Sequence, residues 1–204
     1  MPTNNYFFNF KKCFLIAEIG VNHNGDMVLA KEMIEAACES GADAVKFQTF
    51  KAETLVSQGT PKVKYQESTT SSEESHFEMI KSLELSYDNH FLLQDYCVKK
   101  DIKFLSTPYD VECARFLNEE LNVQVFKTAS ADLVDLSLHD YIASTGKPSI
   151  VSVGMASLGE IEENLNIYNS YKHRDIILLH CVSNYPCAHE NLNLRVLETL
   201  KQAF

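Results

Sequence analysis

The sequence contains no cysteine pair with C-x-x-C spacing, no glycine-rich phosphate loop and no apolar run of membrane-spanning length. Its six cysteines are scattered, which argues against a zinc knuckle and favours reduced thiols in a cytoplasmic protein. The absence of a Walker motif and of a dinucleotide fingerprint argues against those nucleotide-binding folds. A bilayer span needs about 20 consecutive apolar residues, so we expect no membrane association.

The chain also has little positive charge, with 18 lysines and arginines against 28 acidic residues and a net charge of −10. Nucleic acids and anionic membranes both require a basic surface, so neither is expected as a partner. Lys11 and Lys12 interrupt the first apolar stretch and no small-residue cleavage site follows, which predicts no signal peptide. A small anionic substrate remains compatible, because a few lysines in one pocket can outweigh the global charge.

A length of 204 residues suits one sizeable domain, and six apolar runs within it predict strands. Their side chains are apolar on successive residues, as in strands buried on both faces. Helical patterns separate the runs, and the first of them has Asp26 as its N-cap and Gly41 as its stop. Alternation of strand and helix predicts a parallel α/β sheet or barrel. The predicted strands are Phe14–Ile19, Ala44–Gln48, Lys103–Ser106, Gln124–Thr128, Ser149–Val153 and Ile176–His180.

The interval Lys51–Ser75 is irregular. It is polar, rich in serine, threonine and lysine, and too long for an ordinary connection. It follows the second predicted strand on the side where parallel sheets bind their ligands. The interval is therefore expected to be either disordered or a functional loop.

Polar side chains gather where the predicted strands end. One such residue alone would be read as a turn or a cap. Because the C-terminal ends of parallel strands meet on one face, six strands that end in polar residues predict a ligand site. The candidate residues are Glu18, Asn22, Lys46, Gln48, Thr107, Lys127, Ser130, Asp132, Ser152, His180, Ser183 and Asn184.

The residue types indicate the chemistry of this site. Lysines at the ends of buried strands, Lys46 and Lys127, are unfavourable unless anions pair with them. With the neighbouring hydroxyl groups they suit a phosphate or a carboxylate, although a structural ion pair is the alternative for each. Glu18 and Asp132 would then serve as acid–base or hydroxyl-binding groups. His180 would ligate a metal, shuttle protons or simply be hydrogen-bonded.

Six sequence blocks that carry these residues resemble successive blocks of the sialic acid synthases, including the legionaminate and pseudaminate synthases. The resemblance implies a (β/α)8 TIM-type barrel that condenses phosphoenolpyruvate with an N-acylated mannose-type aldose. The products would be a nine-carbon 2-keto sugar acid and phosphate. It also implies a divalent cation, Mn or Mg, and a homodimer. The blocks are AEIGVNHNGD, AVKFQTF, FLSTPYD, FKTASAD, GKPSIVSVGMA and LLHCVSNYP.

The resemblance also implies roles for single residues. Glu18 would lie near the reacting carbons and the water, and Lys46 would contact substrate oxygens. Asp132 stands where many members carry glutamate, so a side chain one methylene shorter would contact the sugar hydroxyls. His180 matches a metal-ligating histidine. The residues implied to hold phosphoenolpyruvate are Thr107, Lys127, Ser130 and Ser152, and Asn22, Gln48, Ser183 and Asn184 are further predicted substrate contacts.

Two departures from the family pattern shape the expectations. The block after the sixth strand reads YPCAH, and the chain ends at Phe204. Strands seven and eight, a second metal histidine and the C-terminal antifreeze-like domain are therefore expected to be absent. Residues 1–204 would form an incomplete α/β barrel of about six β/α units with open sheet edges, poorly soluble or oligomeric by itself.

Two alternatives remain open at this point. The chain could be an inactive or split-gene fragment that needs a partner half. It could also be another phosphoenolpyruvate-condensing barrel, of the kind that makes 3-deoxy-octulosonate phosphate. That reaction takes a phosphorylated sugar and would want an additional Arg/Lys site, for which Lys46, Lys51 and Lys127 give little support. The aldose itself would be read by loop residues within Lys51–Ser75.

Overall fold

The computed structural model describes residues 12–57, 60–61 and 75–204, which belong to two compact units. The first unit is Met1–Val123 and the second is Gln124–Phe204. Each holds a parallel three-stranded sheet, β1-β2-β3 in the first and β4-β5-β6 in the second. All six predicted strands are confirmed, with ends that differ from the prediction by at most two residues.

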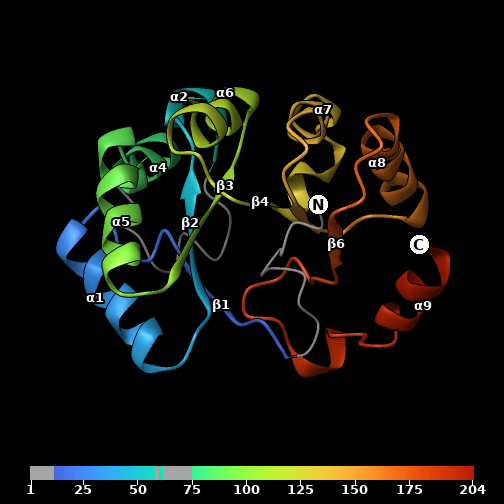
Figure 1. Cartoon of the computed structure of the whole chain (residues 1–204), viewed down its shortest axis with the longest axis horizontal. Helices are drawn as coiled ribbons and strands as arrows, with labels where there is room; N and C mark the ends of the chain where they lie inside the picture. Colours follow the sequence, from blue (N-terminus) through green and yellow to red (C-terminus); the bar gives the residue numbers. More distant parts are fainter. Residues whose placement is uncertain (1–11, 58–59, 62–74) are drawn as a thin grey trace, which may run out of the picture. The chain divides into compact units, whose positions relative to one another are not determined.

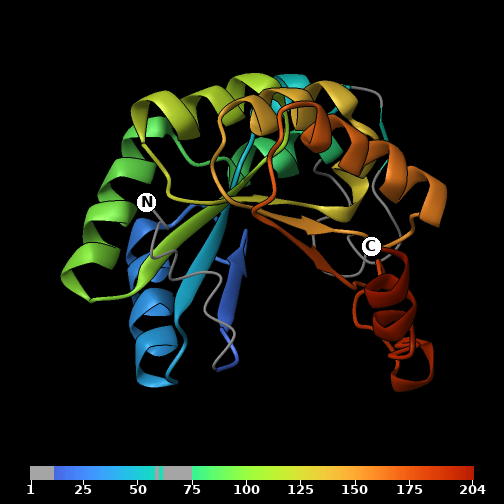
Figure 2. The same ribbon diagram turned by 45° about the vertical axis from the view of Figure 1, so that its right-hand side comes forward.

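In the first unit, helices α1 and α5 lie side by side along the sheet (Figures 1 and 2). The predicted capping of α1 is confirmed, since Asp26 accepts hydrogen bonds from two backbone N–H groups of its first turn. Gly41, at φ +78°, follows its end. The elements are β1 (Ile16–Gly20), α1 (Met27–Glu39), β2 (Ala44–Thr49), α2 (Ala52–Leu55), α4 (His76–Leu83), α5 (Tyr87–Lys99), β3 (Lys103–Pro108), α6 (Val111–Arg115) and the π-helical turn η2 (Phe116–Glu120).

The core of the first unit lies between its sheet and these two helices. Helix α1 contributes buried side chains at helical spacing, and α5 does the same from its facing side. Strand β2 is buried along nearly its whole length. The core residues are Ile19, Ala30, Ile34, Ala37, Val45, Phe47, Leu85, Leu93, Cys97 and Ile102.

Glu84 fixes the segment that follows β2. Its carboxylate accepts from Lys51 Nζ at 2.9 Å, from the backbone N–H of Ala52 at 3.0 Å and from Lys81 Nζ at 3.0 Å. The prediction of an irregular interval over Lys51–Ser75 is wrong at its start, where α2 forms a short helix. Residues 58–59 and 62–74 of that interval lie outside the described residues, so its expected role in reading the aldose stays a prediction.

In the second unit, α7 and α8 pack beside each other (Figures 1 and 2). The prediction that every strand is buried on both faces is wrong for β6, whose side chains are all half-buried. In the described part of the chain, β6 pairs with β5 alone. The elements are β4 (Phe126–Thr128), the 3₁₀ turn η3 (Ser130–Val134), α7 (Leu136–Ser144), β5 (Ser149–Ser152), α8 (Leu158–Ser170), β6 (Ile176–Leu179), the 3₁₀ turn η4 (His189–Asn191) and α9 (Val196–Ala203).

All six cysteines are unpaired thiols, as the scattered spacing predicts. Among the described residues, every helix is too short or too polar to cross a membrane.

Gly25 and Gly41 form a matched pair for testing the turn after β1. Both have positive φ, which costs another residue about 1 kcal/mol. A Cβ on Gly25 would lie 2.5 Å from the carbonyl oxygen of Ser82, whereas one on Gly41 meets no atom within 4 Å. Urea unfolding should therefore show that Gly25→Ala destabilises the protein by about 1–3 kcal/mol more than Gly41→Ala. Equal losses would contradict the close packing of this turn on α4.

His139 on α7 predicts a pH dependence of stability. Burial lowers its pKa from 6.5 to about 4, and the backbone of Asp132 and the charge of Asp135 offset only part of this. The unfolded chain therefore binds the proton first, so the folded state loses stability as the pH falls from 6.5 to about 4. His139→Gln should flatten this part of the curve of unfolding free energy against pH. His189→Gln, at an exposed position, serves as the control.

Candidate functional site

Lys46 is the centre of a polar cluster in the first unit. It lies on β2, the middle strand, and is only 5% exposed. Its Nζ lies 2.7 Å from Thr107 Oγ1 on β3 and 3.0 Å from Glu18 Oε1 on β1, so three adjacent strands supply one group each. The expected alternative of a structural ion pair is thus met in part. However, the Glu18 side chain is 55% exposed, so solvent reaches the pair.

The side-chain amide of Gln48 lies next to Gly20, on the side where Glu18 also lies. The pairing of β1 with β2 shifts register between Glu18 and Gly20, where the backbone has φ +56°. A Cβ at this position would lie 3.3 Å from Glu18 Oε1 and 3.4 Å from Gln48 Nε2. A side chain there would crowd both groups, which explains a glycine at the end of this strand.

The Asn22–Gly25 turn that follows β1 is held by a buried histidine. The backbone N–H of Gly25 donates to His23 Nδ1 at 3.0 Å, so this nitrogen is the acceptor. Burial lowers the pKa of His23 and favours the neutral ring. His23 therefore shapes the turn, while Asn22, a predicted substrate contact, is exposed on it.

Lys127 repeats the arrangement of Lys46 in the second unit. Its Nζ donates to Ser152 Oγ at 2.5 Å and to the carbonyl of the next residue, Thr128, at 2.8 Å. Lys46 likewise donates to the carbonyl of its own successor at 3.2 Å. In both units the hydroxyl partner stands two residues beyond the register partner of the lysine on the next strand. The same strand geometry therefore produces both lysine–hydroxyl pairs.

Two hydroxyl groups of the second unit lie close to Gly154. Its backbone N–H donates to Ser130 Oγ at 3.0 Å. A Cβ on Gly154 would lie 2.8 Å from Ser130 Oγ, 3.0 Å from Ser183 Oγ and 3.0 Å from the carbonyl oxygen of Cys181. Two predicted site residues thus meet at a glycine that the sequence did not single out. The available signal was a glycine two residues beyond Ser152, the serine that ends an apolar strand.

The hydroxyls of these clusters are polarised donors. Thr107 and Ser152 each accept from a lysine ammonium, and Ser130 accepts from a backbone N–H. Since one lone pair of each oxygen is engaged, its own proton can donate to a further acceptor. Hydrogen bonds of this kind to an anionic oxygen are stronger than neutral ones. Each cluster therefore groups donors of the kind that pair with anionic oxygens.

His180 does not assemble a metal site with the described residues. Its Nε2 lies 2.7 Å from the carbonyl oxygen of Leu192, which can only accept, so Nε2 carries a proton and is the donor in this bond. A ligating histidine is often oriented in this way. Yet no group of three or more His, Cys, Asp or Glu side chains in the described ranges is placed to hold a metal ion. A single imidazole donor is insufficient, so the metal stays a prediction.

The remaining predicted residues also belong to the second unit. Asp132 is in η3, two residues beyond Ser130. Ser183 and Asn184 are exposed after β6. Their proposed contacts with substrate stay predictions.

Gly154→Ala tests whether the close approach at this glycine organises the second cluster. The added methyl group should displace the Ser130 and Ser183 hydroxyls and weaken binding of inorganic phosphate about tenfold, measured by calorimetry. The control is Gly159→Ala on α8, where the nearest atom to the new Cβ would be 3.9 Å away. Unchanged phosphate affinity in Gly154→Ala would show that these hydroxyls do not bind the anion.

Comparison with known proteins supports the resemblance predicted from the sequence. The chain is 46% identical over 196 residues to the N,N'-diacetyllegionaminic acid synthase of Campylobacter jejuni, which covers 95% of this chain and 58% of that protein. It is 42% identical over 196 residues to the protein of the same name from Legionella pneumophila, covering 94% and 55%. The crystal structure of N-acetylneuraminic acid (sialic acid) synthetase from Leptospira borgpetersenii, in complex with citrate, superimposes with a TM-score of 0.82 at 35% identity. That match covers 94% of this chain and 61% of the other.

This chain thus spans a little over half the length of the curated relatives that it matches. The expected fold class is confirmed, since parallel strands alternate with helices in six β/α units of the TIM-barrel type. The profile of the NeuB family matches residues 33–204, which is most of the sequence. The chain therefore belongs to the NeuB family.

Proposed function

We propose that residues 1–204 are the phosphoenolpyruvate-condensing part of a sialic-acid-type synthase. The reaction joins phosphoenolpyruvate to an N-acetylmannosamine-like aldose and yields a nine-carbon 2-keto sugar acid and phosphate. The observation that carries this proposal is the repeated lysine–hydroxyl pair, Lys46 with Thr107 and Lys127 with Ser152, in a chain of this family. Both lysines are buried within their strands, β2 and β4, where an anionic substrate would add to the compensation of their charge.

In the first unit, Lys46 and Thr107 would bind an anionic or developing anionic oxygen. Glu18, 3.0 Å from Lys46 and half exposed, is suited to hold water or exchange a proton with it. Gln48, near Glu18 at the Gly20 bulge, would donate from its amide. These residues would manage the proton and the water that the reaction requires.

In the second unit, Lys127, Ser152 and Ser130 would hold a phosphate or carboxylate through charged and neutral donors. Asp132 would contact sugar hydroxyls. His180 would offer one ligand to a divalent metal, Mn or Mg, whose chemistry is Lewis-acid polarisation of an oxygen. One imidazole does not hold such an ion by itself.

The proposed reaction forms one carbon–carbon bond and breaks one carbon–oxygen bond, and it consumes one water. Carbon 3 of phosphoenolpyruvate forms a bond to the aldehyde carbon, and the aldehyde oxygen becomes a hydroxyl. Water adds at carbon 2, and cleavage of the carbon–oxygen bond there releases inorganic phosphate. A buried ammonium close to the leaving oxygen stabilises the charge that develops in this step.

A second candidate is a chain that acts only with a partner half supplying further strands. The half-buried side chains along β6 favour it, because a strand of a closed barrel has a neighbour on each side. Homodimer formation, expected from the resemblance, is likewise a proposal for this chain.

Phosphate release distinguishes these possibilities. The chain is incubated with phosphoenolpyruvate and either N-acetylmannosamine or a phosphorylated aldose, with and without the separately produced C-terminal half of the Campylobacter relative. Release that depends on the unphosphorylated aldose supports the proposal, and a requirement for the added half supports the second candidate. Preference for the phosphorylated sugar would favour the octulosonate-type reaction instead.

Lys127→Met should weaken phosphoenolpyruvate binding at least about tenfold in calorimetry, because a buried charge-assisted contact is lost. Lys99→Met is the matched control, since Lys99 is an exposed lysine on α5. Wild-type affinity in Lys127→Met would overturn the anion-binding role of the second cluster.

A further inference from the structure

A buried hydrogen-bond chain lies at the ends of β2 and β3 in the first unit. Thr49 Oγ1 is 2.6 Å from Ser106 Oγ and 2.8 Å from His90 Nε2. His90 Nδ1 is 2.9 Å from the carbonyl oxygen of Ser86. All three side chains are at most 1% exposed. The function proposed above uses none of these residues.

The direction of this chain follows from the chemistry of its last member. A carbonyl oxygen only accepts, so His90 Nδ1 carries the proton that bonds Ser86. Burial lowers the pKa of His90, as do the charges of Lys51 and His23, while the backbone oxygens of Ser86 and Gln48 offset only part of this. The ring is therefore neutral and Nε2 is an acceptor. Thr49 must donate to Nε2, and Ser106 must donate to Thr49.

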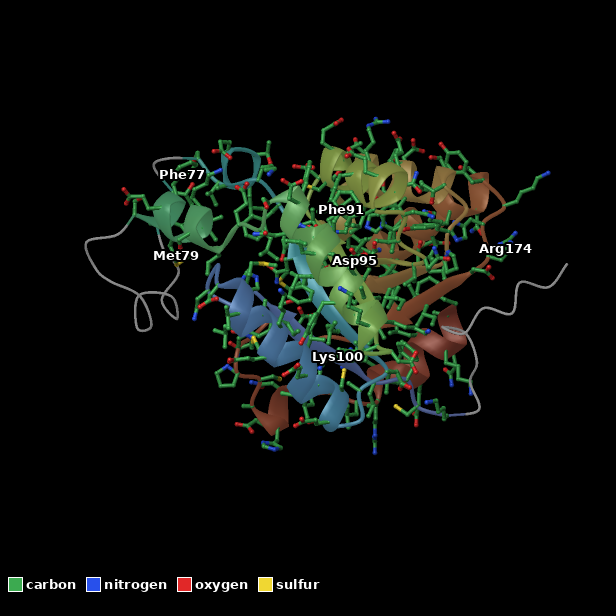
Figure 3. The ribbon with its side chains drawn as sticks, turned by 60° about the vertical axis from the view of Figure 1, so that its left-hand side comes forward. Phe77, Met79, Phe91, Asp95, Lys100 and Arg174 are labelled. Carbon is green, nitrogen blue, oxygen red and sulfur yellow. The ribbon has the colours of Figure 1, made fainter. Side chains whose placement is uncertain are left out.

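Helix α5 aims His90 at the sheet. His90, Leu93 and Cys97 recur at helical spacing and are all buried. Figure 3 shows Phe91 and Asp95 along the outward side of the same helix. His90 is thus a polar member of an otherwise apolar helix face, and among the described residues its side chain bonds to the hydroxyl of Thr49 at the end of β2.

Strands β2 and β3 connect this hydrogen-bond chain with the Lys46 cluster on the opposite face of the sheet. Successive side chains of a strand point to opposite faces of the sheet, so Ser106 and Thr107 face opposite ways. Ser106 bonds to Thr49 on the helix-covered face, while Thr107 bonds to Lys46 on the other. Because the two residues are adjacent on β3, fixing Ser106 also fixes Thr107. Gln48, which pairs with Thr107 in the sheet, lies on β2 between Lys46 and Thr49, the two residues that make these contacts.

We propose that His90 is a positioning residue, which acts through Thr49 and Ser106 to hold Thr107 at hydrogen-bond distance from Lys46. It does not touch substrate. The role in catalysis rests on the proposed function, whereas the positioning of Thr107 does not depend on it. Loss of the hydrogen bonds among His90, Thr49 and Ser106 should leave the fold in place. It should let the ends of β2 and β3 shift by enough to lengthen the contact between Lys46 and Thr107.

The test changes the helix-covered face and observes the opposite one. Thr49→Val keeps the shape of the side chain and removes the hydroxyl, whereas Thr49→Ser keeps the hydroxyl. The Thr107 methyl signal in NMR spectra should shift in Thr49→Val and in His90→Asn, and should stay near its wild-type position in Thr49→Ser. His90→Gln, which keeps an acceptor within reach of Thr49, should restore it in part. An unmoved Thr107 signal in Thr49→Val would overturn the proposal.

His139→Gln is the control for a general effect of removing a buried histidine. His139 is as buried as His90 but bonds to Tyr168 in the second unit, so it should lower stability without moving the Thr107 signal. Long-range ¹H–¹⁵N spectra should show the proton of His90 on Nδ1. A proton on Nε2 would reverse the deduced chain and contradict the proposal.

Binding of phosphoenolpyruvate separates this proposal from the proposed function. Thr49→Val should weaken the binding affinity for phosphoenolpyruvate about fivefold, as expected when one hydrogen bond is weakened, whereas Thr49→Ser should leave the affinity unchanged. If the wild-type protein binds none, the proposed function fails, and the Thr107 signal still decides the positioning role. If the signal moves but affinity is unchanged, Lys46 and Thr107 do not bind the substrate anion together.

Discussion

A buried ammonium group has to be surrounded by acceptors, and this requirement organises the polar half of both units. Lys46 and Lys127 meet it in the same way, with the carbonyl of the following residue and a hydroxyl from the next strand. Both arrangements need a parallel neighbour in one register, because the hydroxyl must stand two residues past the lysine's partner. The register of the strand pairing therefore determines which hydroxyl group each lysine contacts.

Much of the fold follows from the sequence because its strands are short, apolar and separated by well-capped helices. Asp26 and Gly41 mark the ends of α1 by the mechanisms expected of an N-cap and a positive-φ stop. The apolar pattern alone does not indicate the half-buried state of β6, for which only the expectation of open sheet edges allows. An apolar run reads the same whether one neighbouring strand or two lie beside it.

The sequence identified the residues of the polar clusters more readily than their partners. Lys46, Thr107, Lys127 and Ser152 were all predicted, but nothing in the sequence pairs one lysine with one hydroxyl, since that depends on register. Gly154 went unnoticed because its importance lies in the side chain that it lacks. His90 went unnoticed for a different reason. A histidine within a helical pattern carries no sign of the strand-end hydroxyl that it meets.

Glu84 has a consequence for how this fold can diverge. One carboxylate ties Lys51 and Ala52, just past β2, to the C-terminal end of α4, where Lys81 also binds it. The Glu84 carboxylate therefore holds these two points of the chain close together. Closing a longer excursion between fixed ends adds little entropy cost. Descendants of this sequence can thus lengthen, shorten or rewrite that excursion while the ammonium of Lys46 keeps its neighbours.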